Sequence, residues 1–196
     1  SLVIPVMNEE QNIKPLHDSI KNSLSDLKFQ IVFVDDGSID STADKIRSLK
    51  DKNIKLVQFT RNYGQTSAIA AGIEYADGDY IVTMDGDLQN DPKDIKFMLN
   101  KIEKEKLDIV LGIRKKRQDG LILRKIPSKI ANWLIRKFTK VSVTDLGCTL
   151  KVFKATLAKK LDLYGELHRF IPIIASMYGA KIAEVEVSHH ARKFGQ

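Results

Sequence analysis

Residues 80–92 read YIVTMDGDLQNDP, and this stretch decides how the rest of the sequence is interpreted. Residues 80–84 are apolar and β-prone, which predicts a buried strand, and the acidic turn Asp85-Gly86-Asp87 follows directly. Asp91 and Pro92 then supply an N-cap residue and a proline for the first turn of a helix. A strand that leads through a turn into a helix is the repeating unit of a parallel sheet covered by helices.

The same alternation extends along the chain in both directions. Further apolar runs that predict strands lie at residues 2–6, 29–34, 54–59 and 107–111. Helical spacing of apolar side chains occupies residues 11–27, 41–49, 64–75 and 92–105. We therefore predict an α/β fold with a mostly parallel central sheet between helical layers.

The composition fits one domain with a substantial core. The chain has 196 residues, of which 43% are hydrophobic and 29% are charged. The single cysteine, Cys148, excludes an internal disulfide framework and a zinc site built from several thiolates, and it fits a reducing, cytoplasmic setting. A net charge of +7 points to an anionic partner.

The two ends of the sequence suggest a piece of a longer protein. The chain begins inside a strand-like run at Ser1 and stops at Gln196 without a terminating pattern. No apolar run reaches the roughly 18–20 residues that a membrane-spanning helix needs. We expect truncation at both ends and place any membrane anchor outside residues 1–196.

Acidic residues follow three of the predicted strands. Glu9 follows the first strand, Asp36 the second, and Asp85 and Asp87 the fourth. Ligands of parallel sheets bind beyond the carboxyl ends of the strands, so these side chains share one edge. Turn formation alone also explains Asp-Gly pairs. However, three acidic strand ends in one crevice repel one another unless a cation lies between them.

We therefore predict a divalent cation that carries a nucleotide diphosphate. Asp85 and Asp87 supply carboxylates and Gln89 a neutral oxygen, a ligand set that suits Mg²⁺ or Mn²⁺ rather than zinc. Glu9 and Asp36 are then expected to form hydrogen bonds with the base or the ribose of the nucleotide. The sequence contains neither a P-loop nor a dinucleotide-binding glycine motif.

The order of these motifs resembles that of the inverting family-2 glycosyltransferases with the GT-A fold. The matching strings are PVMNE at residues 5–9, VDDGS at residues 34–38 and DGDLQNDP at residues 85–92. Within that family the sequence is most similar to the polyisoprenyl-phosphate glycosyltransferases, the group of dolichol-phosphate mannose synthase and its bacterial undecaprenyl-phosphate relatives. The resemblance implies one Rossmann-like, three-layer catalytic domain over residues 1–196. Its nucleotide-sugar-binding half would be residues 1–111 and its acceptor-binding half residues 112–196.

The resemblance also implies roles for individual residues. The nucleoside pocket would be lined by Pro5, Met7, Glu9, Val34 and Asp36. Ribose and diphosphate would face Met84, Asp85, Gly86 and Asp87. The direct metal ligands would be Asp87 and Gln89, while Asp85 shares the metal or binds sugar hydroxyls. Phosphate groups would be approached by Arg114 and Arg192. The catalytic set is then Asp85, Asp87, Arg114 and Asp145. Met7 replaces an aromatic residue usual in the family, which leaves uridine and guanosine nucleotides both open.

Residues 114–140 form a basic segment with interleaved apolar residues. Asp119 is the only acidic residue among them. This pattern is typical of a helix at an anionic membrane surface, although a solvated helix face with Trp133 in the core is an alternative. No nucleic-acid-binding module accompanies the charge, so we expect no nucleic acid partner. The lipid phosphate is predicted to contact Arg114, Arg124, Ser128, Arg136 and Arg192.

The expected function is metal-dependent, inverting transfer of a sugar from a nucleoside-diphosphate sugar to a polyisoprenyl phosphate at the cytoplasmic face of the membrane. A phosphate acceptor is already anionic and needs no general base. Asp145 and His168 are possible bases, but we interpret Asp145 as forming a turn with Gly147 and His168 as capping the following helix. One alternative is a transferase of the same fold that acts on a hydroxyl of a glycan or protein. Another is a sugar-nucleotide-binding or nucleotidyltransferase module, which is disfavoured because no glycine-rich basic loop follows the first strand.

Overall fold

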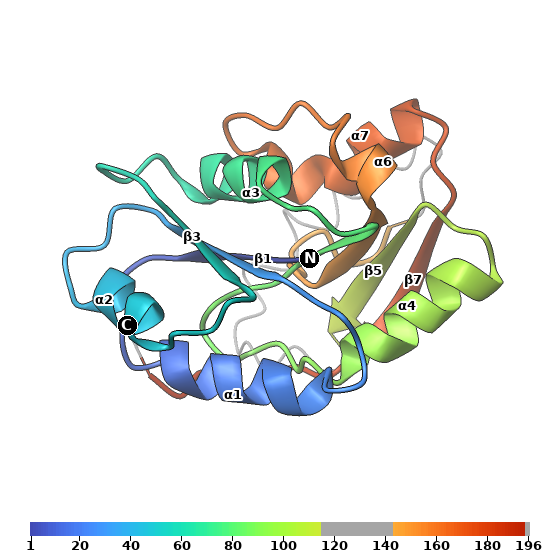
Figure 1. Cartoon of the computed structure of the whole chain (residues 1–196). Coiled ribbons are helices and arrows are strands. Elements are labelled where there is room, and N and C mark those ends of the chain that lie inside the picture. The colour runs from blue at the N-terminus through green and yellow to red at the C-terminus, as the bar shows by residue number, and fades with distance from the viewer. Residues whose placement is uncertain (115–142, 195–196) are drawn as a thin grey trace.

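The computed structural model describes residues 1–114 and 143–194 (Figure 1). The first of these ranges alternates strands and helices: β1 (Leu2–Val6), α1 (Ile13–Ser23), β2 (Ile31–Asp35), α2 (Thr42–Ser48), β3 (Ile54–Gln58), α3 (Gln65–Glu74), β4 (Tyr80–Thr83), α4 (Asp94–Lys104) and β5 (Ile109–Arg114). The second range contains β6 (Lys151–Lys154), α6 (Ala155–Ala158), the 3₁₀ helix η2 (Leu167–Phe170), α7 (Ile171–Met177) and β7 (Ile182–Val187). All strands and helices predicted up to residue 111 are present, with small differences at their ends.

Among the described residues, seven strands form one sheet with the order β3-β2-β1-β4-β6-β5-β7. The pairs β1–β2, β1–β4, β2–β3 and β5–β7 are parallel, whereas β6 runs antiparallel to both β4 and β5. The prediction of a mostly parallel sheet is therefore confirmed. The insertion of β6 brings the residues before it to the edge where β4 and β5 end.

Helices cover both faces of the sheet, with α1, α2 and α4 on one side and α3, α6 and α7 on the other (Figure 1). Successive side chains of a strand point to opposite faces. In β1, Ile4 packs into the core beneath α1 and α4, while Val3 packs with Ile69 of α3. Burial on both faces explains why the sequences of β1, β2 and β4 are mostly apolar.

The loops at the carboxyl ends of the strands need left-handed backbone. Asn8 has φ 55°, Leu88 has φ 67° and Gly37 has φ 75°. A Cβ atom at Gly37 would lie 2.4 Å from the backbone carbon of Arg61, so the loop after β2 packs directly on the loop after β3. Glycine is the residue that permits both this backbone conformation and this approach.

Within the described ranges, every helix is too short or too polar to cross a membrane.

Candidate active site

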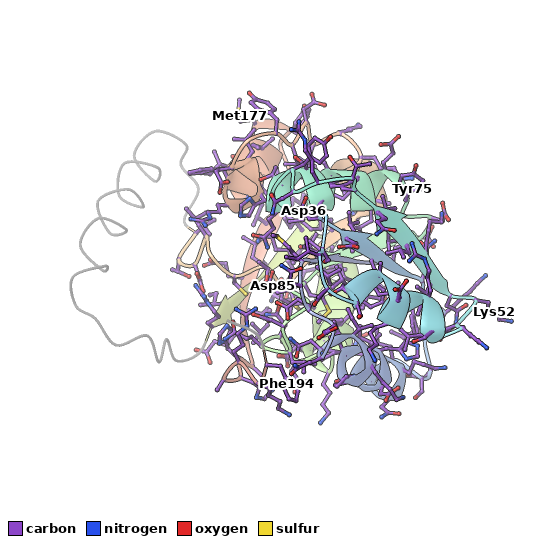
Figure 2. The ribbon with its side chains drawn as sticks, turned by 90° about the vertical axis from the view of Figure 1, so that its left-hand side faces the viewer. Asp36, Lys52, Tyr75, Asp85, Met177 and Phe194 are labelled. Atoms are coloured by element: carbon purple, nitrogen blue, oxygen red, sulfur yellow. The ribbon has the colours of Figure 1, made fainter. Side chains whose placement is uncertain are left out.

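Two of the strand-end carboxylates, Asp36 and Asp85, lie near each other on the same side of the molecule (Figure 2). Both residues lie in loops at the carboxyl ends of their strands: Asp36 directly follows β2, and Asp85 follows β4 after one further residue. This is the edge at which parallel α/β sheets bind ligands.

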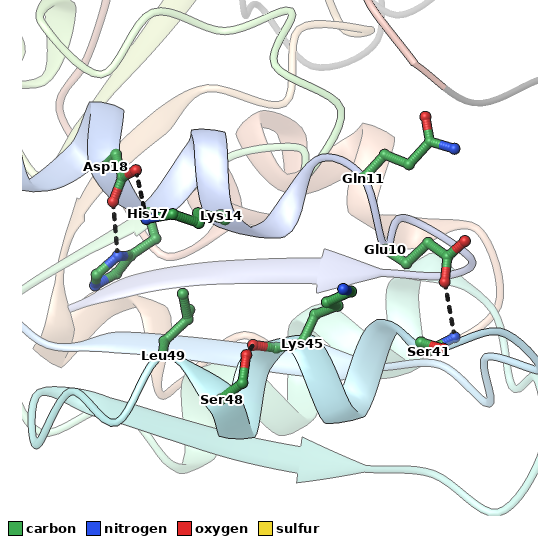
Figure 3. Close-up of a pocket in the computed structure, with 9 residues that line it drawn as sticks. All are labelled: Glu10, Gln11, Lys14, His17, Asp18, Ser41, Lys45, Ser48 and Leu49. Carbon is green, nitrogen blue, oxygen red and sulfur yellow. Dashed lines mark hydrogen bonds and ion pairs between the residues drawn. The ribbon is translucent and has the colours of Figure 1, made fainter.

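A separate groove of about 640 Å³ lies between α1 and α2 (Figure 3). Its lining includes Lys14, His17 and Lys45, and at one end the Glu10 carboxylate accepts a hydrogen bond of 3.2 Å from the Ser41 backbone N–H. None of the strand-end carboxylates predicted to bind ligand lines this groove. We therefore place the site at the sheet edge and not in the groove between the helices.

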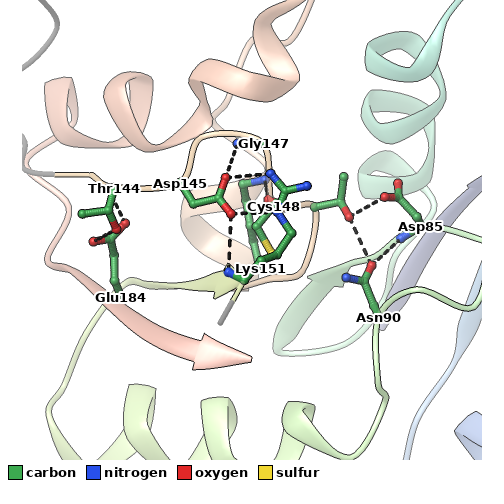
Figure 4. Close-up of polar contacts among 10 residues, drawn as sticks. Asp85, Asn90, Thr144, Asp145, Gly147, Cys148, Lys151 and Glu184 are labelled. Atoms are coloured by element: carbon green, nitrogen blue, oxygen red, sulfur yellow. Dashed lines mark hydrogen bonds and ion pairs between the residues drawn. The ribbon is translucent and has the colours of Figure 1, made fainter. Parts of the chain in front are cut away.

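The Asp85 carboxylate is enclosed by polar side chains from α3 and the loop before β6. Its Oδ1 accepts a hydrogen bond of 2.9 Å from Gln65 Nε2. Its Oδ2 accepts one of 2.7 Å from the Thr149 hydroxyl, which is the contact drawn at Asp85 in Figure 4. Burial raises the pKa of Asp85, and the nearby charge of Asp87 raises it further, while Thr149 and Gln65 oppose the change. Asp85 is therefore held in a fixed orientation by protein groups.

Asp87 lies in the turn that follows, next to Gln89. Its Oδ1 accepts a hydrogen bond of 3.1 Å from the Gln89 backbone N–H. The Gln89 side-chain nitrogen donates to the carbonyl of His190 at 3.3 Å, and the His190 N–H donates back to the Gln89 carbonyl at 2.9 Å. These contacts fix the turn and use the nitrogen of the Gln89 amide, which leaves its oxygen for a ligand.

The donor set fits a hard divalent cation. The oxygens of Asp85, Asp87 and Gln89 are of the type that Mg²⁺ and Mn²⁺ prefer. In residues 1–114 and 143–194, no three histidine, cysteine, aspartate or glutamate side chains converge on a possible metal position. The described residues thus supply only part of a coordination shell. A cation that keeps waters and takes oxygens from a diphosphate matches such a site.

Arg114, at the end of β5, forms a two-pronged ion pair with Asp145 from the loop before β6. Arg114 Nε lies 2.8 Å from Oδ2 of Asp145 and Nη2 lies 3.0 Å from Oδ1. The Gly147 N–H also donates to Oδ1 at 3.0 Å, which confirms the predicted turn. Burial alone would raise the pKa of Asp145, but the Arg114 guanidinium holds it below its ordinary value. Asp145 is therefore an ionised partner of Arg114 whose two oxygens are both engaged.

His168 does not cap the following helix, and that prediction is wrong. The residue lies inside η2, which separates it from α7, and α7 has no side-chain cap. The buried His168 ring instead places Nδ1 2.6 Å from the Thr66 hydroxyl on α3. Burial lowers the pKa of His168, which favours the neutral ring.

The predicted nucleoside residues lie around the ends of β1 and β2. Both oxygens of Asp36 accept backbone hydrogen bonds from the loop before α3, 2.7 Å from Tyr63 N–H and 2.9 Å from Gly64 N–H. The buried Glu9 carboxylate accepts from Asn12 and, at 2.5 Å, from Nη2 of Arg192. Arg192 thus reaches the nucleoside side of the edge in this structure.

The remaining nucleoside and diphosphate candidates differ in exposure. Met7 is 44% exposed, and its sulfur lies 2.7 Å from the Asn62 side-chain nitrogen. Pro5 is half-buried, and the Gly86 backbone is buried. The side chains of Val34 and Met84 are fully buried in the core, which leaves only their backbone to face a ligand.

Arg124, Ser128 and Arg136 lie outside the described residues, as does the basic segment beyond Arg114. Sequence reasoning missed Gln65, Thr149 and the buried Lys151, which surround Asp85 and the Arg114–Asp145 pair. The signal that could have identified Lys151 is a lysine directly before the apolar residues Val152 and Phe153, because a charged residue beside a buried strand indicates a special role.

The family model for glycosyl transferase family 2 matches residues 1–162. The chain belongs to glycosyl transferase family 2. This family 2 chain is 45% identical to a dodecaprenyl-phosphate galacturonate synthase from Rhizobium johnstonii, over 100% of this chain and 60% of that protein. It is 37% identical to an undecaprenyl-phosphate 4-deoxy-4-formamido-L-arabinose transferase from Proteus mirabilis, over 100% of this chain and 61% of that protein. The chain therefore spans about three fifths of the length of these curated relatives.

The GT-A fold of this family 2 chain is confirmed by solved structures. Glucosyl-3-phosphoglycerate synthase from Mycobacterium tuberculosis, in complex with Mn²⁺, UDP and phosphoglyceric acid, matches with a TM-score of 0.75 and 18% identity. The match covers 98% of this chain and 70% of that structure.

Proposed function

We propose that the chain transfers a sugar from a nucleoside-diphosphate sugar to a polyisoprenyl phosphate, undecaprenyl or dolichyl. The transfer inverts the anomeric carbon and takes place at the cytoplasmic face of the membrane. The names of both curated relatives, a dodecaprenyl-phosphate synthase and an undecaprenyl-phosphate transferase, support this acceptor class. We further propose that residues 1–196 act as one catalytic domain, with the donor bound by residues 1–111 and the acceptor by residues 112–196.

The observation that carries the proposal is the engagement of both possible general bases. Asp145 is paired through both oxygens with Arg114, and the His168 ring contacts the Thr66 hydroxyl. A hydroxyl acceptor needs a base to remove its proton, but a phosphate monoester attacks as an anion. The geometry therefore favours a phosphate acceptor over the hydroxyl acceptor of a glycan or protein.

We assign different roles to the residues at the carboxyl edge of the sheet. Asp87 and Gln89, with Asp85, would hold Mg²⁺ or Mn²⁺, which when bound supplies positive charge to the departing diphosphate. Gln65 and Thr149 fix the orientation of Asp85.

An oxygen of the acceptor phosphate attacks the anomeric carbon while the bond from that carbon to the diphosphate breaks, so the configuration inverts. On the donor side, the buried carboxylates of Glu9 and Asp36 would position the nucleoside, as the sequence predicts. On the acceptor side, we assign contact with the phosphate to Arg114, Arg124, Ser128 and Arg136. Arg192, which pairs with Glu9 in this structure, would have to leave that carboxylate to reach the same phosphate. The basic segment at residues 114–140 would lie on the membrane surface.

The test is a transfer assay with undecaprenyl phosphate. Radiolabelled UDP- and GDP-sugars are supplied with Mn²⁺ or Mg²⁺, and labelled lipid is measured after extraction into organic solvent. The Mn²⁺ and UDP of the solved neighbour make a UDP-sugar with Mn²⁺ the first combination to try. We expect labelled lipid with the native chain and none with Asp87→Asn, while Asp44→Asn, a change on the exposed side of α2, serves as the control. Failure of every donor to label a lipid phosphate would contradict the proposal.

A further inference from the structure

The last described segment of the chain, residues 188–194, crosses the carboxyl edge of the sheet as a strap. It leaves β7 at one end of the sheet, and β5, β6 and β4 lie between β7 and β1. On the way it pairs with the turn after β4, where the Gln89 carbonyl accepts from the His190 N–H at 2.9 Å and the Gln89 amide donates back at 3.3 Å. Two residues later, Arg192 reaches Glu9, which follows β1. The strap therefore connects the proposed diphosphate side of the donor site with its nucleoside side.

Arg192 engages the Glu9 carboxylate directly. Nη2 of Arg192 lies 2.5 Å from Oε1 of Glu9, while Oε2 of Glu9 accepts a hydrogen bond from the Asn12 amide. The Glu9 side chain is only 10% exposed, whereas the Arg192 side chain is 38% exposed. Both carboxylate oxygens are thus engaged by the protein. Because Arg192 lies toward solvent, its guanidinium can withdraw without any change in the core.

A nucleoside that binds Glu9 must compete with Arg192. The proposed role of Glu9 is to accept a hydrogen bond from the base or the ribose, and its Oε1 is the oxygen that Arg192 covers. A nucleoside without phosphates would displace the guanidinium and offer it no new anion. A nucleoside diphosphate offers phosphate oxygens, which a guanidinium binds with two parallel hydrogen bonds.

The proposed diphosphate position lies within reach of Arg192. Asp87 is two residues before Gln89, and Arg192 is two residues after His190, the residue that pairs with Gln89. Two residues of chain span at most about 7 Å. The long arginine side chain can therefore exchange the Glu9 carboxylate for a phosphate bound at the turn.

We propose that the Glu9–Arg192 ion pair makes the donor site select nucleoside diphosphates over nucleosides. The pair closes Glu9 to ligands without phosphate, and it opens when a diphosphate draws the guanidinium away. This inference rests on the donor site of the proposed function and adds Arg192 to that site as a specificity-determining residue. A hydrogen bond to a charged group contributes on the order of tenfold or more to an equilibrium constant, so the effect is large enough to measure.

The experiment measures binding of UDP and of uridine by NMR titration at a fixed concentration of Mg²⁺, with GDP and guanosine as the second pair of ligands. The variant is Arg192→Met, which removes the charge and keeps most of the length of the side chain. The matched control is Lys193→Met, which removes one positive charge from the neighbouring exposed position of the strap. Arg192→Ala is a second variant without the charge, and circular dichroism verifies that each variant is folded.

We expect both Arg192 variants to change the two affinities in opposite directions. The nucleoside should bind about tenfold more tightly, because it no longer competes with a guanidinium for Glu9. The diphosphate should bind at least about threefold more weakly, because a two-pronged contact with phosphate is stronger than the single contact with Glu9 that it replaces. Lys193→Met should retain the native ratio of the two affinities.

Nucleoside binding that stays equal or weakens in both Arg192 variants would overturn the inference. Diphosphate binding that tightens together with nucleoside binding would also overturn it, because Arg192 would then only obstruct the pocket. Failure of the native chain to bind either UDP or GDP would instead contradict the donor site of the proposed function. The two failures are thus distinguishable.

Discussion

Replacement of Asp145 by asparagine should destabilise the fold far more than loss of a surface ion pair. Asparagine can still accept the Gly147 N–H through its oxygen, but its amide nitrogen replaces the oxygen that accepts from Arg114 Nε. The change therefore removes both the charge opposite Arg114 and one of its hydrogen-bond acceptors. The side chains of Arg114 and Asp145 are only 15% and 12% exposed. Removal of one partner from a buried ion pair costs about 3–5 kcal/mol, and the residual exposure places Asp145→Asn near the lower end, at about 3 kcal/mol.

Urea unfolding followed by circular dichroism measures this loss, with an unchanged slope against urea as the sign that the folded state is intact. A double-mutant cycle with Arg114→Met isolates the coupling between the two side chains. The matched control is Asp18→Asn, which breaks the exposed Lys14–Asp18 pair on α1 and should leave the unfolding midpoint unchanged.

The pH dependence gives an independent check. The pKa of Asp145 is lowered in the folded chain, so its contribution is complete above about pH 4 and is lost as the pH falls through the folded pKa. Asp145→Asn should lack that part of the acid-induced loss. A cost below about 1 kcal/mol, the range of exposed pairs, would show that the Arg114–Asp145 pair does not behave as a buried ion pair.

Three further outcomes test other parts of the structure. The Asn53 N–H and the side chains of His17 and Lys21 lower the pKa of Asp51 to about 2, so native stability should fall between about pH 4 and pH 2, and acid titration of Asp51→Asn should lack that loss. Gly37→Ala should lower the free energy of unfolding by at least about 1–3 kcal/mol in urea, because a left-handed backbone and a crowded Cβ both oppose alanine. Burial raises the pKa of the Cys148 thiol, so a thiol reagent should label it only after unfolding, and rapid labelling of the native chain would contradict its packing.

The sequence predicted β1, β2, β4 and β5 because their residues are largely buried and therefore mostly apolar. The edge strand β3 is only partly buried, and its apolar residues Ile54, Leu56 and Val57 were sufficient to predict it. The sequence did not predict β6, whose first residue is the buried Lys151, because a lysine argues against a core strand until its charge partners are known. It also did not predict β7, although residues 182–187 alternate apolar and polar side chains in the manner of a strand. The antiparallel insertion of β6 depends on long-range pairing that no local pattern encodes.

The site residues, like the strands, could be predicted where the pattern is local and not where it depends on distant contacts. Asp85, Asp87 and Gln89 were predicted together because their spacing in one turn is local. The contact of Glu9 with Arg192 joins residues 183 positions apart and has no local signal. His168 was interpreted as a cap because η2 could not be distinguished from the start of the next helix, and the structure places its ring against α3 instead.

The proposed phosphate acceptor is tested most directly by a comparison of two acceptors that differ only in the phosphate. The native chain is supplied with Mn²⁺, a labelled nucleotide sugar, and either undecaprenyl phosphate or the corresponding alcohol, and labelled lipid is measured. We expect transfer to the phosphate alone, because an anionic acceptor needs no general base and both possible bases, Asp145 and His168, are engaged by the protein. Transfer to the alcohol at a comparable rate, or to neither lipid with any donor, would contradict the proposed acceptor.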